Sequence, residues 1–565
     1  MNEEAVKQLT KKGCMVGKEA AEIITDEDLE RIEELPATPM YISDDMIGQI
    51  RERMSQKVVV SSQGGQVSEE IETDVETSKQ VEKTASSSAS EPQQEEHLEE
   101  DVVEDESSDN RDDQKPVQID ESAVNNDREP EEEKEENDIY SRKSSHFSSD
   151  KTVRLRDDRR RDELDTKVEV LDDYDIEKCD KDVPEFLGYY NDRYEKMKKL
   201  LMRRSELRSA TSIKRLERRS EGDEAAVIGL VESKYSTNSG KYIVNLEDKT
   251  GSFKALVGER EGRKIVEDEM IGVSGSMGGD IVYADSVIRP DLPIPDGVNK
   301  TKDKVKAAYI SDLHIGSEDT LHDRLDRFAK WLGTSEASDI GYLVMPGDVV
   351  EGVGVYPNQE EELEINSIYK QYEKFEDWVE KVPEDIQVLI GPGNHDITRL
   401  AEPQPKISEK ALPRVSDFNN VHLVKNPQTV RLHGIRSKGI TNLMYHGYSF
   451  DEHIDKIKSL RENAYEDPYH VMVDLLKRRH LAPSYGSNLL APEAEDPLVI
   501  QKKPDIFVSG HLHSHSVYSY KGVNVIAAST FQAQTDFQKR VGHEPDPGKV
   551  TIVDYKNRNT EVKQF

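Results

Sequence analysis

The chain has 565 residues and a formal net charge of −37 at pH 7, which excludes a protein that coats nucleic acid through bulk positive charge. Much of the acid lies in one segment, because residues 301–565 carry a net charge of only about −8. The two cysteines, Cys14 and Cys179, exclude a disulfide framework and predict a reducing, cytoplasmic location. No apolar run approaches membrane-spanning length, so we expect no signal peptide, no transmembrane helix and no membrane partner.

Residues 1–50 are predicted to form a small helical domain. Leu29, Ile32 and Leu35 recur at helical spacing and would share one face of a helix. An amphipathic tail that frays in water would show the same spacing, and these residues do not separate the two interpretations.

Residues 51–152 are predicted to form a disordered acidic linker. Acidic and serine runs dominate this segment, and no aromatic residue occurs between Tyr41 and Tyr140. A segment of this composition buries too little apolar surface to offset the conformational entropy that ordering would cost.

Residues 153–220 are predicted to be a helical, basic segment. Tyr190, Tyr194, Met197 and Leu201 fall on one helical stripe. A dense run of Lys and Arg accompanies the stripe, and it fits contact with a nucleic-acid backbone and a merely solvated helix face about equally well. The candidate nucleic-acid contacts are Lys199, Arg203 and Arg204.

Residues 221–295 are predicted to form a small barrel of the oligonucleotide-binding (OB) kind. Five short apolar runs are separated by turn signals such as Asn238-Ser239-Gly240. This fold binds nucleic acid or docks proteins, and the scarcity of aromatic residues here favours docking at least as much as stacking on bases. The expected strands are Ala226–Val231, Lys241–Leu246, Ser252–Leu256, Met270–Ser274 and Asp280–Tyr283.

Residues 301–565 are predicted to form an α/β domain in which β-sheets are sandwiched between helices. Strands and helices alternate early in this region, and strands cluster late. Helices are expected over Leu321–Leu332 and Ile368–Val382. The expected strands are Val305–Ile310, Gly341–Met345, Gln387–Ile390, Asn442–His446, Ile506–Ser509, Val523–Ala527 and Val550–Tyr555.

Metal-ligand residue types follow five of these strands directly. A lone histidine at a strand end is more often packed or solvated than a ligand. Five strand ends in one chain that are each followed by Asp, Asn or His are not expected by chance. The carboxyl ends of strands are where α/β enzymes build their sites. In chain order the five motifs are Asp312-Leu313-His314, Gly347-Asp348, Gly393-Asn394-His395-Asp396, His446-Gly447 and Gly510-His511-Leu512-His513.

This set of motifs resembles the calcineurin-like phosphoesterase superfamily, which carries a two-metal centre. The resemblance implies that His395 is not a ligand but a catalytic residue that faces the scissile phosphate. Two cations can bind one phosphate, lower the pKa of a water between them and neutralise both reacting oxygens. The implied ligands are Asp312, His314 and His513 for one metal, Asn394, His446 and His511 for the other, and Asp348 as the bridge.

Imidazole-rich ligation suits Mn²⁺, Fe or Zn²⁺ better than Mg²⁺, which prefers oxygen ligands. The nucleases of this superfamily use Mn²⁺, so the resemblance implies two divalent ions, most simply Mn²⁺.

A second resemblance covers about residues 160–565. It rests on segments that include GDVVEGVGVYPNQEEEL (347–363), GPGNHDITRLAEPQP (391–405), YHGYSFDEHI (445–454) and FQAQTDFQKR (531–540). These segments resemble the small subunit of the archaeal family-D DNA polymerase, which is similar to the B-subunits of eukaryotic replicative polymerases. The resemblance implies a 3′–5′ proofreading exonuclease that binds a large catalytic subunit and acts on primer-template DNA, without polymerising.

Two other functions compete with this one. The first is a scaffold B-subunit whose metals are structural or vestigial, and the second is a stand-alone repair nuclease or phosphatase of the same superfamily. The complete ligand set favours the exonuclease over the scaffold, and the barrel ahead of the α/β domain favours it over the stand-alone enzyme. Metal identity, exonuclease polarity, complex stoichiometry and a sliding-clamp contact are not fixed by the residues.

Overall fold

The computed structural model describes residues 15–16, 24–25, 41–42, 166–171, 174, 176, 183–356, 359–434, 439–486 and 489–565. The predicted acidic linker lies outside the described residues, and so does the predicted helical domain apart from three residue pairs. The chain divides into two units, Met1–Asp138 and Ile139–Phe565. Within the first unit, β1 (Met15–Val16) pairs in parallel with β2 (Tyr41–Ile42).

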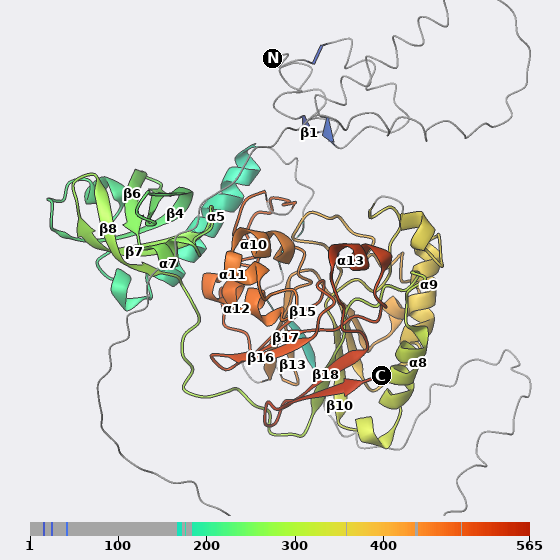
Figure 1. The fold of residues 1–565 in the computed structure, drawn as a ribbon. Helices are drawn as coiled ribbons and strands as arrows, with labels where there is room; N and C mark the ends of the chain where they lie inside the picture. Colours follow the sequence, from blue (N-terminus) through green and yellow to red (C-terminus); the bar gives the residue numbers. More distant parts are fainter. Residues whose placement is uncertain are drawn as a thin grey trace, which may run out of the picture. The chain divides into compact units, whose positions relative to one another are not determined.

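Two six-stranded sheets form the centre of the α/β domain (Figure 1). The first sheet has the order β12 (Val421–Leu423), β11 (Gln387–Ile390), β10 (Ile340–Met345), β9 (Lys306–Tyr309), β18 (Lys549–Asp554), β19 (Thr560–Gln564). The second sheet has the order β16 (Ser516–Tyr520), β17 (Val523–Ala527), β15 (Ile506–Ser509), β14 (Ile440–Met444), β13 (Gln428–Leu432), β3 (Val168–Leu171).

The central strands β10 and β15 are buried along their whole length because both faces of each sheet are covered there. Ala307 and Tyr309 of β9 belong to the core shared by the two sheets, whereas Ala308 packs on the opposite face with the helices. A buried polar contact also joins the sheets, since the Tyr309 hydroxyl donates to Asn442 Oδ1 at 2.6 Å. The predicted sandwich of sheets and helices is confirmed.

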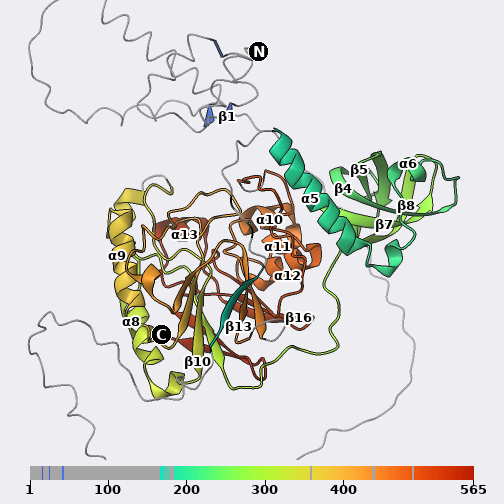
Figure 2. The same ribbon diagram turned by 180° about the vertical axis from the view of Figure 1, so that it is seen from behind.

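Helices cover the outer face of each sheet (Figures 1 and 2). Helices α8 (His322–Leu332) and α9 (Ile368–Val379) pack on the first sheet, with Phe328 and Phe375 in its outer core. The second sheet is covered by α10 (Phe450–Lys456), α11 (Lys458–Arg461) and α12 (Tyr469–Arg478). In the described part of the chain, no helix is both long and apolar enough to cross a membrane.

The predicted barrel is present as a closed five-stranded sheet with the order β4-β5-β6-β8-β7. Its interior holds alternate apolar residues, among them Val227, Val244 and Val273. One ion pair ties it to the α/β domain, because buried Arg478 of α12 binds buried Glu269. The barrel strands are β4 (Glu224–Ser236), β5 (Tyr242–Asp248), β6 (Gly251–Val257), β7 (Met270–Met277) and β8 (Ile281–Ile288), with α7 (Glu259–Gly262) between β6 and β7.

The segment ahead of the barrel departs from the expectation that residues 153–220 are helical. It does contain α5 (Val183–Leu201) and α6 (Ile213–Leu216), but Val168–Leu171 forms strand β3, which pairs antiparallel with β13. Val-Glu-Val-Leu has the alternation and β-branching of an edge strand, and its partner lies about 260 residues later in the chain, where local periodicity gives no signal.

The buried face of α5 includes Met197 and Leu201 of the predicted stripe but differs from it at the tyrosines. Tyr189 and Arg193 are buried, whereas Tyr190 and Tyr194 are half-buried. Burial of an arginine is invisible to an apolar pattern, and here it is made possible by Asp496, whose Oδ2 lies 2.5 Å from Arg193 Nε.

Candidate metal centre

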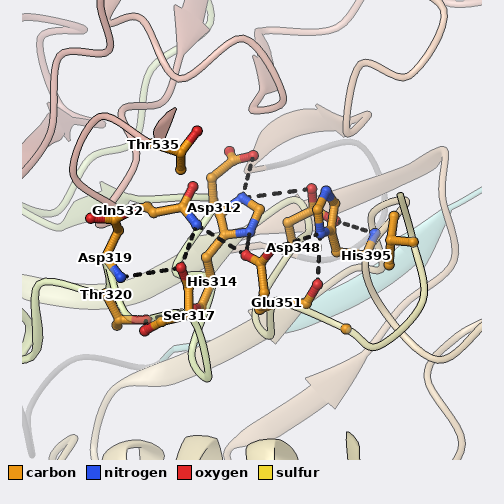
Figure 3. Close-up of polar contacts among 12 residues, drawn as sticks. Asp312, His314, Ser317, Asp319, Thr320, Asp348, Glu351, His395, Gln532 and Thr535 are labelled. Carbon is orange, nitrogen blue, oxygen red and sulfur yellow. Dashed lines mark hydrogen bonds and ion pairs between the residues drawn. The ribbon is translucent and has the colours of Figure 1, made fainter. Parts of the chain in front are cut away.

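The five motifs that follow strand ends come together because the strands that precede them are parallel. β10 pairs in parallel with β9 and β11 in one sheet, and β14 pairs in parallel with β15 in the other. Their carboxyl ends therefore point the same way within each sheet, and the polar residues that follow gather at one edge of the sandwich. Figure 3 shows four of these residues side by side: Asp312, His314, Asp348 and His395.

The first cluster consists of Asp312, His314 and His513, all three buried. Nε2 of His314 lies 3.0 Å from Nε2 of His513, and Nε2 of His513 lies 3.5 Å from Oδ1 of Asp312. The ligand atoms of all three residues lie within 4.8 Å of one another, so one cation could contact them all.

The second cluster contains Asp348, His446 and His511, together with Asn394. Nε2 of His446 lies 3.1 Å from Oδ2 of Asp348 and 3.0 Å from Oδ1 of Asn394. The same Asp348 oxygen lies 3.9 Å from Nε2 of His314 in the first cluster. Asp348 therefore stands between the clusters, where a bridging carboxylate belongs.

The backbone is unusual at five of these residues. All five have a positive φ, a conformation that residues other than glycine seldom adopt and that costs free energy unless the surroundings enforce it. The five are Asp312 (54°), His314 (47°), Asp348 (50°), His511 (73°) and His513 (56°).

Glycines in the motifs leave room for the ligands. A Cβ atom at Gly393 would collide with the carboxylate of Asp348, and one at Gly510 would collide with the carboxylate of Asp312. The glycines of the Gly-Asn and Gly-His motifs are thus steric requirements of the cluster rather than simple turn residues.

The electrostatics of the centre couple carboxylates to imidazoles. Burial would raise the pKa of Asp348, but His446 and His395 outweigh it and hold the pKa of that carboxyl well below its usual range. Burial likewise lowers the pKa of His446, yet Asp348 outweighs this effect and raises the pKa to about 9. Without metal, protons on the imidazoles therefore balance the buried carboxylates, and bound cations would take the place of those protons.

Glu351 is a residue of the centre that the sequence reasoning missed. Nδ1 of His314 donates to its Oε2 at 2.8 Å, which leaves Nε2 of that imidazole for a cation. Its carboxylate also accepts from Gln532 and Gln359, at 3.0 and 2.9 Å, and His314 holds its pKa at about 2 against the opposing effect of burial. The sequence feature that points to Glu351 is its position in the Gly-Asp-Val-Val-Glu stretch that follows β10.

Two further supporting residues were missed as well. Nε2 of His511 lies 2.7 Å from Oδ2 of Asp451, so the nitrogen left to face a cation is Nδ1. Nδ1 of His513 accepts from the side-chain amide nitrogen of Gln538 at 2.9 Å, which holds the ring with Nε2 toward the first cluster. Carboxylates and amides that fix the orientation of a ligating imidazole are a regular feature of protein metal sites.

His395 lies beside both clusters without belonging to the predicted ligand set. Its Nδ1 donates to the backbone oxygen of Glu351 at 2.7 Å, and because a carbonyl only accepts, Nδ1 carries the hydrogen. Its ring meets that of His314 edge to face at 4.7 Å. Nε2 is then the nitrogen that can exchange a proton with a group bound at the centre. His314, Glu351 and His395 also lie close enough together for one cation to contact all three, and the exclusion of His395 from the ligands stays a prediction.

The three candidate nucleic-acid contacts lie elsewhere. Lys199 and Arg203 are exposed at the end of α5 and beyond it, and Arg204 pairs with Glu206 at 3.1 Å. No contact among the described residues links the three to the metal centre, and their role stays a prediction.

The donor set fits divalent cations. Each cluster combines buried carboxylate or amide oxygen with imidazole nitrogen, a mixture typical of Mn²⁺, Fe and Zn²⁺ sites rather than of Ca²⁺ or Mg²⁺. The facing Nε2 atoms of His314 and His513 are polar atoms of buried residues. Burial of a polar atom costs free energy unless it has a partner, and a bound cation would be a partner for both.

Comparison with known proteins identifies both a domain family and a family of longer proteins that contain that domain. Residues 305–515 match the family model of the calcineurin-like phosphoesterases. The DNA polymerase II small subunit of Methanocaldococcus jannaschii is 36% identical over 411 residues, covering 69% of this chain and 67% of that protein. The chain belongs to the family of DNA polymerase II small subunits.

Other archaeal members agree. The DNA polymerase II small subunits of Halobacterium salinarum and Thermoplasma acidophilum are 38% and 36% identical, over 67% and 71% of this chain and 75% and 82% of theirs. Among solved structures, an archaeal phosphodiesterase matches 46% of this chain at 12% identity with a TM-score of 0.22, too weak a likeness to carry a conclusion. Membership in the family is confirmed, and with it a phosphoesterase domain of a class that works with divalent metals.

Proposed function

We propose that this chain is the proofreading subunit of a replicative DNA polymerase and removes nucleotides from the 3′ end of DNA at the candidate metal centre. The observation that carries the proposal is the convergence of all seven predicted ligand side chains from five strand ends. A scaffold without activity would have no use for five strained backbone turns that aim buried ligands at one another.

The first cation would be held by Asp312, His314 and His513, and the second by Asn394, His446 and His511, with Asp348 shared. When bound, two such cations supply charge neutralisation at the phosphate and activation of the attacking water. The mixed nitrogen and oxygen donors fit Mn²⁺, Fe or Zn²⁺, and of these Mn²⁺ is the proposed ion because the superfamily resemblance implies it.

The protein's own side chains orient the ligating imidazoles and donate a proton to the substrate. Glu351 and Asp451 hold two imidazoles in the tautomer that cation binding needs, and Gln538 fixes the direction of a third. Nε2 of His395, kept in place by the Nδ1 contact to the Glu351 carbonyl, donates a hydrogen bond or a proton to the phosphate or to the leaving 3′ oxygen.

The partner is the large subunit that the relatives' name implies. We propose that the large subunit docks on the barrel and the adjacent surface of the α/β domain, and that it supplies most of the grip on primer-template DNA. The acidity of the α/β domain supports this, since such a domain gains little affinity for DNA from bulk charge.

A proofreading assay tests the proposal. The chain and its large subunit are co-purified and given a 5′-labelled primer with a 3′ mismatch, in Mn²⁺ or in chelator. We expect a ladder of products shortened from the 3′ end, only with Mn²⁺ and only with an intact Asp348. The same ladder from an Asp348→Asn complex would overturn the assignment of the activity to this centre.

A further inference from the structure

A short helix lies at the edge of the metal centre. Helix α13 (Asp536–Val541) follows Thr535, whose side chain forms a reciprocal capping pair with Gln538. Figures 1 and 2 show α13 between α9 and α10 in both views. Through the Gln538 amide, 2.9 Å from Nδ1 of His513, this helix touches a candidate ligand directly.

The segment that carries α13, residues 530–546, is fastened to the first cluster at both ends. Before the helix, the Thr530 hydroxyl and the Phe531 amide both donate to the backbone oxygen of Asp312, at 2.8 and 2.9 Å. After the helix, the Asp546 amide donates to the backbone oxygen of His513 at 2.9 Å. Figure 3 shows Gln532 and Thr535 of this segment next to Asp312. We call residues 530–546 the rim segment, since it is anchored to Asp312 and His513, two of the three residues of the first cluster.

The rim segment presents an aromatic ring and a cation to solvent. The Phe537 side chain is 56% exposed, although it belongs to a helix only six residues long and directly precedes Gln538. Arg540 is exposed, lies three residues later and so shares the face of Phe537. Lys539 pairs with Asp536 at 2.9 Å, whereas Arg540 forms no ion pair with any residue that the structure describes.

We propose that Phe537 and Arg540 bind the single-stranded end of the DNA substrate beside the first metal cluster, with Phe537 stacked on a base and Arg540 on a phosphate. The proposal rests on the nuclease function proposed above and names how that site holds its substrate. A ring stacks on every base, which suits an exonuclease that meets all four. An exposed guanidinium beside the centre supplies a phosphate contact within a net-acidic domain.

The geometry also explains why the contact sits on this helix. The Gln538 contact to His513 fixes the helix relative to the cluster, so a base held by Phe537 would place the neighbouring phosphodiester at a set distance from the metals. One lone exposed phenylalanine would need no explanation. Here the ring adjoins a residue that touches a candidate ligand and shares its face with an unpaired cation.

Binding measurements on the full-length chain test the inference separately from catalysis. A fluorescent single-stranded oligonucleotide is titrated in chelator, so that no hydrolysis occurs, and the salt dependence of Kd is recorded. For Phe537→Ala we expect binding weakened about 5- to 150-fold, the range for loss of one stacked base, and for Phe537→Trp we expect it retained. For Arg540→Ala we expect a salt slope smaller by about 0.7, the loss of one phosphate contact on a single strand.

Matched controls are available on the helices of the first sheet. Tyr369 of α9 is 65% exposed and Arg327 of α8 is exposed without an ion pair among the described residues, so Tyr369→Ala and Arg327→Ala should bind like the wild type. Mn²⁺ stoichiometry, measured on all variants, should stay unchanged and reports that the centre is intact.

The outcomes separate the two proposals. If Phe537→Ala and Arg540→Ala bind like the controls while the wild-type complex degrades DNA, the rim segment does not hold the substrate and this inference is overturned. If both variants lose binding but the wild-type complex degrades no DNA, the rim segment holds DNA as inferred and the nuclease function is overturned.

Discussion

The Nε2 atoms of His314 and His513 face each other across 3.0 Å in a buried site. Two imidazoles can hold that position only if one donates a proton to the other or both bind a cation. Burial alone would lower the pKa of His314, but Glu351 outweighs it and raises the pKa to about 9, while burial lowers the pKa of His513. The metal-free pair therefore shares one proton between the two nitrogens, and a cation must displace it.

Loss of the bridging carboxylate should disable the centre. Asp348→Asn removes the charge that both clusters share while keeping the size of the side chain. We expect Mn²⁺ binding to be weakened at both positions and DNA hydrolysis to fall below about 1% of wild type, because two-metal catalysis needs both ions in register. Metal analysis and the mismatch assay measure this, with Asp417→Asn, an exposed aspartate, as the control.

His395→Ala should separate catalysis from metal binding. The side chain contacts the Glu351 carbonyl and the His314 ring but is not in the predicted ligand set. We expect both Mn²⁺ ions to remain and turnover to fall about 10²- to 10⁴-fold, the usual contribution of a positioned acid or base. Loss of one Mn²⁺ ion from this variant would show instead that His395 is a ligand.

Glu351→Gln should weaken the first cation selectively. The change keeps the shape of the side chain but removes the charge that accepts from Nδ1 of His314. We expect an affinity for one of two Mn²⁺ ions lower by about 10- to 100-fold, as for other outer carboxylates at metal sites. Calorimetric titration should resolve one weakened and one unchanged site. Equal weakening of both sites would mean that Glu351 acts on the whole centre.

The positions of the candidate ligands could be predicted from the sequence because each follows an apolar run with the length and composition of a buried strand. β11, β15 and β17 begin and end at the expected residues, and the polar groups after β11 and β15 lie where parallel strands place them. Periodicity fixes where a strand ends, and strand ends are where this fold puts its chemistry.

The supporting residues could not be predicted, because tertiary contacts alone bring them to the centre. Asp451 reaches His511 from α10, about 60 residues away in sequence, and Gln538 reaches His513 from α13. Strand β3 joins its sheet across a similar gap in the chain. Neither residue spacing nor composition predicts such long-range pairings. The positive φ angles of the candidate ligands are likewise set by the packed surroundings.

A buried histidine away from the centre should make the protein sensitive to acid. Nε2 of His480 lies 2.9 Å from Oδ2 of Asp496, and Nδ1 accepts from the Ala482 amide, so the neutral ring is fully bonded. Burial first, and Arg193 next, lower its pKa from 6.5 to about 4. Because the unfolded chain binds this proton more readily, the contribution to stability is present above pH 6.5 and is lost as the pH falls toward 4.

Urea unfolding at two pH values measures this effect. From the two pKa values, His480 should cost about 2 kcal/mol of unfolding free energy between pH 7 and pH 5. His480→Gln cannot titrate, so its unfolding free energy should fall by about 2 kcal/mol less over the same interval. An identical pH dependence in the two proteins would show that His480 is not the group responsible.

Anomalous scattering from crystals grown with Mn²⁺ tests the two-metal centre most directly. The account predicts two manganese peaks about 3.5–4 Å apart, the spacing of two-metal phosphoesterase sites. One peak should lie among Asp312, His314 and His513, the other among Asn394, His446 and His511, with Asp348 contacting both. A single peak, or peaks away from these seven side chains in a preparation that degrades DNA, would contradict it.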